Sequence, residues 1–173
     1  MNPACYICGG SGCYHYVRDK ERSIFRCSDC GVFFVYPQPT PQELSRLYDE
    51  GYYTGRKEEN TGYKSYRAMS DWLVWIAEER MKIMLQSNPS LSGKIHDVGC
   101  ATGEFLQVAM KRGFQASGCD LSESIVQGCR ERGLEVYATT IHGLPYGASS
   151  FDAITFFDSL EHTLTPVRDI QRT

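Results

Sequence analysis

The sequence predicts an α/β protein whose C-terminal part forms a parallel sheet of about four strands, preceded by a cysteine-rich head and a helical connector. Short β-rich runs alternate with helical runs from Lys94 onward, which is typical of parallel strands joined by right-handed crossovers. Five of the eight cysteines fall in the first thirty residues, and prolines mark the segment that follows them. We therefore expect three units, over residues 1–36, 37–92 and 93–173.

The overall composition is that of a globular protein. Of the 173 residues, 42% are hydrophobic and 23% are charged, and the net charge is -3 without a long run of one sign. This charge pattern indicates neither a nucleic acid nor a membrane surface as a partner. No apolar stretch approaches the ~20 residues of a membrane-spanning helix, and the N-terminus lacks the apolar region of an export signal. We expect an unexported, cytoplasmic protein.

The head carries two Cys-x-x-Cys-Gly turns, one at Cys5 and Cys8 and the other at Cys27 and Cys30, separated by eighteen residues. This spacing matches four-thiolate zinc sites, because each turn aims two sulfurs at one point and four thiolates complete a tetrahedron. Such a closed site is structural, since it leaves no position for water. The alternative is two disulfides or free thiols.

Cys13 and His15 lie near the paired turns, but four thiolates already satisfy zinc, so we interpret both as bystanders. Zinc ribbons also bind nucleic acid, which needs a basic face. The head has a net charge of +1 and its charges alternate in sign, so nucleic acid is the less favoured partner. The charged residues are Arg18, Lys20, Arg22 and Arg26 against Asp19, Glu21 and Asp29.

The connector contains two expected helices. Thr40 and Glu43 form a capping box with Pro41 at the first helical position, which predicts a short helix to about Tyr48. Apolar residues then recur at helical spacing over residues 63–86, which predicts one long amphipathic helix. Its apolar stripe is interpreted as core packing, with a substrate lid as the alternative.

The C-terminal part alternates strands and helices. Gly113 and Gly133 sit just past the two expected helices, as left-handed C-terminal caps. The helices are expected over 104–112 and 123–132, and the strands over 94–99, 115–120, 135–140 and 153–157.

The turn from the first of these strands into its helix is rich in small residues, from Asp97 to Gly103. Such a turn lets a ligand approach the backbone, and Asp120 ends the next strand where a carboxylate accepts ribose hydroxyls. Together these features predict a nucleoside-containing cofactor. Asp97 would repel a pyrophosphate but would suit a ligand that bears an ammonium group.

Residues 94–173 resemble the first half of a class I S-adenosylmethionine-dependent methyltransferase of the small-molecule type, which has a Rossmann-like sheet. The head and the connector, with Tyr52 and Tyr53, are similar to zinc-ribbon modules that precede such enzymes. The segments that carry the resemblance are Asp97–Gly103, Cys119–Ser122, Leu144–Asp152 and Asp158–His162 followed by Pro166.

The resemblance implies S-adenosylmethionine and zinc as cofactors and assigns a role to each matched residue. Asp97 would contact the amino group of the cofactor, Asp120 its ribose, and Leu121 its adenine. Ala101 replaces the usual glycine, and residues 139–142 lack the acid that often receives the adenine amine, so backbone or a hydroxyl near Ile141 would do so. The residues expected to border the methionine end are Gly99, Cys100, Ala101 and Gly103.

Asp158 and His162 are the candidates to line the acceptor site, and His162 could equally cap the helix near Thr165. His96 is interpreted as structural. Cys100 and Cys119 lack a nearby base and are not expected to be nucleophiles. Two functions stay open: methylation of a small-molecule acceptor, or a cofactor-binding or partner-binding fragment without turnover.

The related sheets continue with three further strands that complete the acceptor pocket, so the chain is expected to be truncated. Its last strand, at residues 153–157, would then be an exposed apolar edge that invites pairing. We expect self-association through this edge or poor order in the last twenty residues, with absent or slow methyl transfer.

Overall fold

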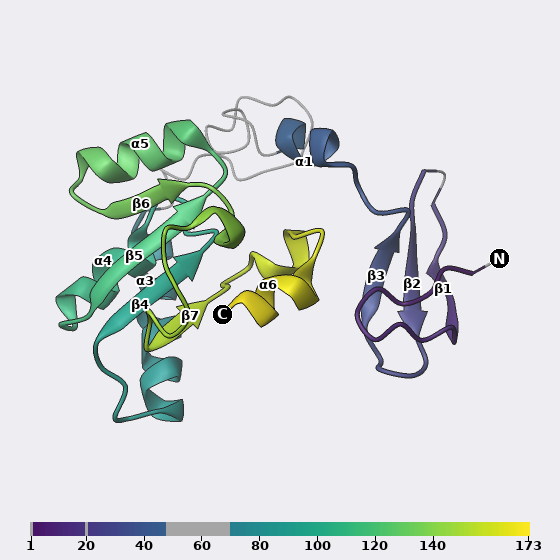
Figure 1. Cartoon of the computed structure of the whole chain (residues 1–173), viewed down its shortest axis with the longest axis horizontal. Helices are drawn as coiled ribbons and strands as arrows, with labels where there is room; N and C mark the ends of the chain where they lie inside the picture. The colour runs from purple at the N-terminus through teal and green to yellow at the C-terminus, as the bar shows by residue number, and fades with distance from the viewer. Residues whose placement is uncertain (1, 20, 48–69) are drawn as a thin grey trace.

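The computed structural model describes residues 2–19, 21–47 and 70–173. It contains a three-stranded sheet near the N-terminus and a four-stranded sheet covered by helices in the C-terminal part (Figure 1). Tyr52 and Tyr53, and the first residues of the predicted long helix at 63–69, lie outside the described residues.

The N-terminal sheet is antiparallel and consists of β1 (Cys13–Val17), β2 (Ser23–Cys27) and β3 (Phe33–Tyr36), in that order. Its side chains alternate between two faces, as strand geometry requires. One face packs into a small core around Phe25, Phe34 and three cysteines, Cys5, Cys13 and Cys27. Because this core is small, folding of the head needs a further cross-link or a bound metal.

The connector begins with α1 (Pro41–Leu47), and its predicted capping box is confirmed. The Thr40 backbone N–H donates to Glu43 Oε2 at 2.7 Å, and the Glu43 N–H donates to Thr40 Oγ1 at 3.2 Å. These two bonds satisfy backbone groups that would otherwise lack a partner at the start of the helix. Arg22 of the head forms an ion pair with the same Glu43 carboxylate at 2.5 Å.

The second connector helix, α3, spans Ser70–Ser87 and packs against the helices of the parallel sheet. Ala77 and Met81 are buried, with Met84 beside them in the same core. The prediction that the whole apolar stripe is buried was wrong for Trp72 and Ile83, which are exposed. The contact follows the i, i+4 row through Ala77 and Met81, and these two side chains lie off that row.

The C-terminal sheet is parallel, with the strand order β6-β5-β4-β7. The strands begin at their predicted residues and end within two residues of the predicted ends: β4 (Lys94–Val98), β5 (Gln115–Asp120), β6 (Glu135–Ala138) and β7 (Ala153–Thr155). The helices are α4 (Glu104–Lys111), α5 (Glu123–Glu131) and α6 (Pro166–Arg172), with 3-10 turns η2 (Ile141–Gly143) and η3 (Leu160–His162). The predicted caps are confirmed, with positive φ at Gly113 and Gly133.

The sheet has two different faces. Helices α3, α4 and α5 cover one face and form the main core with Ile95, Phe105, Leu106 and Val126 (Figure 1). The other face carries a smaller cluster of Val98, Cys119, Ile141 and Leu144, built partly from the segment after β6. This arrangement places the C-terminal ends of β4 and β5 side by side, which is where ligands bind in parallel α/β sheets.

Strand β7 pairs only with β4 within the described residues and forms one edge of the sheet. The structure describes the last twenty residues as the end of β7, η3 and α6. Both outcomes expected for the edge, self-association and poor order of the last twenty residues, stay predictions. None of the described helices has the length and apolarity of a membrane span.

Candidate functional site

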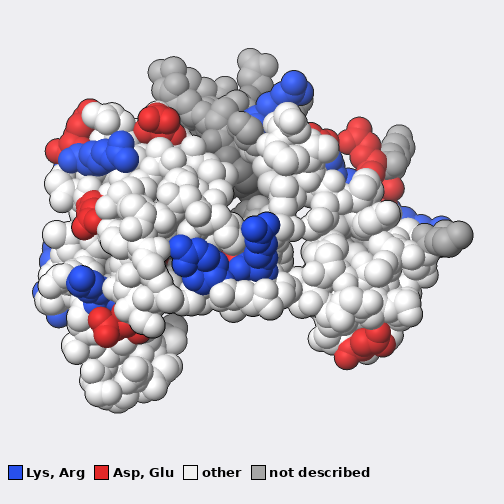
Figure 2. Space-filling model, in the orientation of Figure 1, with Lys and Arg blue, Asp and Glu red and all other residues white. Residues whose placement is uncertain are grey.

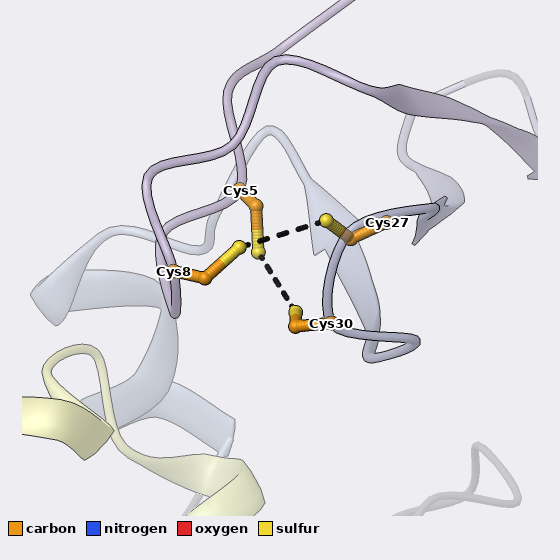
Figure 3. A group of neighbouring side chains, drawn as sticks. All are labelled: Cys5, Cys8, Cys27 and Cys30. Carbon is orange, nitrogen blue, oxygen red and sulfur yellow. Dashed lines mark hydrogen bonds between the residues drawn. The ribbon is translucent and has the colours of Figure 1, made fainter.

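Four cysteines of the head converge on one point (Figure 3). Their sulfurs all lie within 4.8 Å of one another, with 3.8 Å between Cys5 and Cys30 and 3.7 Å between Cys8 and Cys27. A tetrahedron of thiolates around zinc, with bonds of ~2.3 Å, has sulfurs about 3.8 Å apart. The predicted ligands are therefore brought together at the spacing that zinc requires.

The two Cys-x-x-Cys turns share the same local geometry. Gly9 and Gly31 both have positive φ, and their N–H groups donate to the carbonyls of Cys5 and Cys27 at 2.8 Å and 3.0 Å. A hydrogen bond from the Cys30 backbone is the main cause that lowers the pKa of Cys27 to about 7. This backbone hydrogen bond stabilises negative charge on the Cys27 sulfur, whereas hydrogen bonding among the neighbouring thiols and burial raise the pKa values of Cys8 and Cys30.

Cys13 and His15, the predicted bystanders, are not part of this four-sulfur group. The Cys13 thiol is buried and lies 3.7 Å from the carbonyl of Gly10. The His15 ring packs against Phe25, with 4.2 Å between ring centroids. Both contacts are structural.

The predicted small-residue turn joins β4 to α4. Gly99 and Gly103 have positive φ, which favours glycine at both positions. A Cβ on Gly99 would lie 2.5 Å from Ser159 Cβ, and one on Gly103 would lie 2.6 Å from Leu134 Cδ1. The sequence reasoning gave the approach of a ligand as the reason for these glycines, but packing within the protein is sufficient to require them.

Asp120 holds this turn in place from the end of β5. Its Oδ2 accepts the N–H of Ala101 at 3.1 Å, and its Oδ1 accepts the N–H of Ser122 at 2.9 Å. Ala101 itself has a φ of 43°, a conformation that non-glycine residues rarely adopt. Asp120, the residue predicted to bind ribose, is therefore hydrogen-bonded directly to the turn predicted to bind the methionine end of the cofactor.

The predicted adenine-side residues differ in exposure. Leu121 follows Asp120 and is 64% exposed, so its apolar side chain is available to contact a ligand at the C-terminal ends of the strands. Ile141 begins η2, is only 4% exposed and packs with Val98 and Cys119. The Ile141 side chain is thus part of the core, and its backbone is the part that could meet a ligand.

Asp97 is buried at the end of β4 and accepts a hydrogen bond from Thr155 Oγ1 at 2.7 Å. Burial raises the pKa of Asp97 to about 7, against the opposing effects of this hydrogen bond and of the Arg80 charge. A buried carboxyl at this edge would gain charge stabilisation from a neighbouring cation, such as an ammonium group.

Arg80 is a functional candidate that the sequence reasoning missed, because it sits in a helix interpreted only by its apolar stripe. Its guanidinium forms an ion pair with Asp158 and lies 4.9 Å from the centre of the Phe157 ring. Asp158 has a φ of 50°, so the chain turns sharply after β7. Helix α3 therefore brings a cation to the predicted acceptor residue.

His162 lies in η3 and its Nε2 is 3.9 Å from the Glu161 carboxylate. Thr165, at the start of α6, donates from its hydroxyl to Asp169 Oδ1 at 2.9 Å, and His142 Nε2 meets the same oxygen at 2.6 Å. This contact between η2 and α6 involves residues that the sequence reasoning did not select.

The remaining predicted residues have structural environments. His96 is fully buried, its Nδ1 lies 2.8 Å from Ser117 Oγ, and burial lowers its pKa to about 4. Burial raises the pKa of Cys119 to about 12 and that of Cys100 well above its ordinary value. Buried neutral thiols of this kind are poor nucleophiles, as expected.

Surface charge is unevenly distributed in the view of Figure 2. Basic side chains gather over α6, which contains Arg168 and Arg172, whereas the three-stranded sheet shows mainly uncharged atoms. The exposed side chains of that sheet include Tyr14, Tyr16 and Phe33. The face of the three-stranded sheet seen in this view therefore shows no basic patch of the kind that phosphate binding uses.

The C-terminal part of the chain matches a known protein family. A family model described as "Methyltransferase domain" matches residues 96–172, which hold the β4 turn, Asp120 and the segment from η2 to α6. Over these residues, which are fewer than half of the 173, the chain is similar to the methyltransferase domain family. The methyltransferase domain covers all eight predicted cofactor residues and both predicted acceptor residues.

Curated relatives of the methyltransferase domain fall into two groups by name. A ubiquinone biosynthesis O-methyltransferase from Methylococcus capsulatus is 37% identical over 90 residues, covering 47% of this chain and 38% of that protein. A tRNA (carboxymethyluridine(34)-5-O)-methyltransferase from Xenopus tropicalis is 34% identical over 76 residues, covering 44% of this chain and 12% of that protein. The chain thus spans half or less of the length of these relatives.

Solved structures support the fold of the methyltransferase domain. The [4+2]-cyclase SpnF has a TM-score of 0.52 and 25% identity, covering 79% of this chain and 56% of that one. The plantazolicin methyltransferase BpumL, in complex with a monoazolic desmethylPZN analog and SAH, has a TM-score of 0.51 and 17% identity, covering 62% and 44%. The predicted Rossmann-like α/β class is confirmed.

Proposed function

We propose that the protein binds S-adenosylmethionine at the C-terminal ends of β4 and β5 and transfers its methyl group to a small-molecule acceptor. The observation that carries this proposal is the position of Asp120, the last residue of β5. Its carboxylate accepts the N–H of Ala101 in the turn after β4 and the N–H of Ser122 in the turn after β5. An ionised carboxylate accepts about four hydrogen bonds, so it can hold ribose hydroxyls as well as the turn.

The other residues fit the same ligand. Leu121 offers an exposed apolar surface for adenine beside Asp120, and the backbone at Ile141 lies across the same edge. Asp97 supplies a buried acid for the amino group, with Gly99 to Gly103 as the wall at the methionine end. The bound cofactor supplies an activated methyl group, and the chain has to orient it toward the acceptor.

The acceptor side is assigned to Asp158 and His162, with Arg80 as an additional member. Arg80 fixes Asp158 by an ion pair, so the carboxylate has a defined position at the end of β7. The role proposed for His162, on the exposed turn η3, is to receive a proton from the acceptor. This division would give the site one anion paired with Arg80 and one candidate base.

Zinc in the head is proposed as a structural ion held by Cys5, Cys8, Cys27 and Cys30. The spacing of their sulfurs supports zinc over two disulfides, because all four thiols are free and converge on one centre. The metal would join the two turns and supply the cross-link that the small core needs. We infer that residues 1–36, 37–92 and 93–173 act as the zinc ribbon, the connector and the catalytic unit.

The names of the relatives point to two different kinds of methyl acceptor. Names of the relatives include both ubiquinone biosynthesis O-methyltransferases and tRNA methyltransferases. The face of the three-stranded sheet that Figure 2 shows carries few charged atoms, which favours a small molecule, since tRNA binding depends on phosphate contacts. The alternative function, a cofactor-binding or partner-binding protein without turnover, is kept open by the [4+2]-cyclase, which shares the fold.

One experiment separates these functions. Binding of S-adenosylmethionine is measured by calorimetry, and methyl transfer is measured on the same sample as release of S-adenosylhomocysteine, with a quinol mixture and bulk tRNA as test acceptors. Binding with transfer to the quinols supports the proposal, and transfer to tRNA alone refutes the small-molecule assignment. Binding without transfer supports the alternative function, whereas absence of binding refutes both.

A further inference from the structure

A fifth thiol lies beside the candidate zinc ligands. Cys13 is 3% exposed and shares its buried cluster with Cys5 and Cys27, which are 1% and 0% exposed. It does not belong to the group of four sulfurs that converge on one centre. The metal site therefore leaves this buried thiol without a role.

Cys13 on β1 lies directly opposite Cys27 on β2 in the antiparallel ladder. In the adjacent pair, the Ser28 N–H donates to the Gly12 carbonyl at 2.9 Å. Hydrogen-bonded and non-hydrogen-bonded pairs alternate along such a ladder, so Cys13 and Cys27 form a non-hydrogen-bonded pair. Opposite Cα atoms in these pairs are roughly 4.5 Å apart, which lies within the range of about 4.4–6.8 Å found in disulfides.

We propose that Cys13 and Cys27 are an oxidation site, at which a hydroperoxide converts the zinc-binding head into a disulfide-linked form that releases the metal. Loss of Cys27 from the ligand set leaves three thiolates, which no longer close a tetrahedral site. The metal release and the path through Cys8 rest on the proposed zinc site, whereas the pairing of Cys13 with Cys27 rests on the strand register.

The chemistry can begin at Cys8, which is exposed, and end at the buried pair. The Cys8 thiolate attacks the peroxide, so that an S–O bond forms, the O–O bond breaks and hydroxide leaves. The Cys27 thiolate, whose sulfur is 3.7 Å from that of Cys8, attacks the sulfenic sulfur and expels a second hydroxide. One of the released hydroxides takes the proton of Cys13, and the Cys13 thiolate then attacks the Cys27 sulfur and displaces the Cys8 thiolate.

In the net reaction, the Cys13 and Cys27 sulfurs together lose two electrons, and these two electrons reduce one hydroperoxide. The exchange favours the cross-strand pair for a physical reason. The register of β1 and β2 places Cys13 opposite Cys27, whereas Cys8 is on a separate turn that the metal would tie to Cys27. Once zinc leaves, the Cys8–Cys27 contact loses that constraint.

The test uses the full chain loaded with zinc and treated with increasing hydrogen peroxide. Thiols are then blocked by alkylation, cross-linked peptides are mapped by mass spectrometry without reduction, and released zinc is measured with a chromophoric chelator. We expect a Cys13–Cys27 peptide that appears together with about one equivalent of zinc. Dithiothreitol and added zinc should reverse both changes.

The variant Cys13→Ser separates this pair from general oxidation of the ligands. We expect it to bind zinc like the wild type, to lose the cross-linked peptide and to accumulate the Cys8–Cys27 disulfide. Cys119→Ser, which removes another buried thiol far from the head, is the matched control and should behave like the wild type.

A wild-type map dominated by Cys8–Cys27 or Cys5–Cys30 would overturn the proposal, and this result does not depend on any variant being folded. Purified protein without metal would refute the zinc site, while the peptide map would still test the cysteine pair.

Discussion

Replacement of Asp120 by alanine tests the cofactor site most directly. The carboxylate accepts the N–H groups of Ala101 and Ser122, and in the proposed complex it also accepts ribose hydroxyls. Hydrogen bonds to a charged group contribute about 1.5–3 kcal/mol each, so loss of two ribose contacts costs about 3–6 kcal/mol. Because about 1.4 kcal/mol corresponds to a factor of ten, affinity for S-adenosylmethionine should fall at least tenfold.

Isothermal titration calorimetry of wild type, Asp120→Ala and Asp120→Asn gives the affinity, and circular dichroism gives the folded fraction. Asp152→Ala is the matched control, since Asp152 Oδ2 also accepts a backbone N–H, from Lys94 at 2.7 Å, but at the opposite end of β4. We expect this control to bind the cofactor like the wild type.

The asparagine variant removes the charge but keeps the size of the side chain and one of its two backbone hydrogen bonds, because its single amide oxygen can accept the N–H of Ala101 or of Ser122. It should fold like the wild type and still bind more weakly. An unchanged dissociation constant in a folded Asp120→Ala protein would refute the ribose assignment. An equal loss in Asp152→Ala would show that the effect comes from general destabilisation of the sheet.

Four further predictions concern the metal, the turn, pH and the sheet edge. Reduced protein should contain about one zinc, and Cys27→Ser should lose it; less than about half an equivalent in the wild type would contradict the site. Ala101→Gly should raise the free energy of unfolding by about 1 kcal/mol in chemical denaturation, because Ala101 has a φ of 43°. Folding lowers the pKa of His96 from 6.5 to about 4, so its neutral form contributes about 3 kcal/mol above pH 6.5 that is lost as pH falls toward 4. His96→Phe should remove this contribution to the dependence of unfolding free energy on pH, measured by chemical denaturation between pH 4 and pH 6.5. Asp97 changes the stability with the opposite sign, but it does so in both proteins, so its contribution cancels in the comparison. The same pH dependence in wild type and His96→Phe would disprove the assignment. Light scattering should detect self-association of the wild type through β7, and Ile154→Lys at this edge should reduce it; a monomeric wild type would exclude this contact.

The resemblance and the sequence pattern together predicted most of the architecture. Alternating strand and helix periods, with glycine caps at Gly113 and Gly133, are local properties and give the element order without knowledge of distant contacts. The capping box of Thr40 and Glu43 is local in the same sense. Spacing alone also selected the four cysteines that converge, because a Cys-x-x-Cys turn has a nearly fixed geometry.

Only the tertiary structure decided which side chains meet across the chain. Arg80 reaches Asp158 from a helix seventy-eight positions away, and no local pattern marks one arginine on a helix as the one that faces the site. The reason for the glycine at 99 is likewise a contact with Ser159, sixty residues later. The pairing of Cys13 with Cys27 depends on strand register, which the hairpin length and the packing of the small core set together. Local periodicity determines the elements, but long-range packing determines which of their side chains can act together.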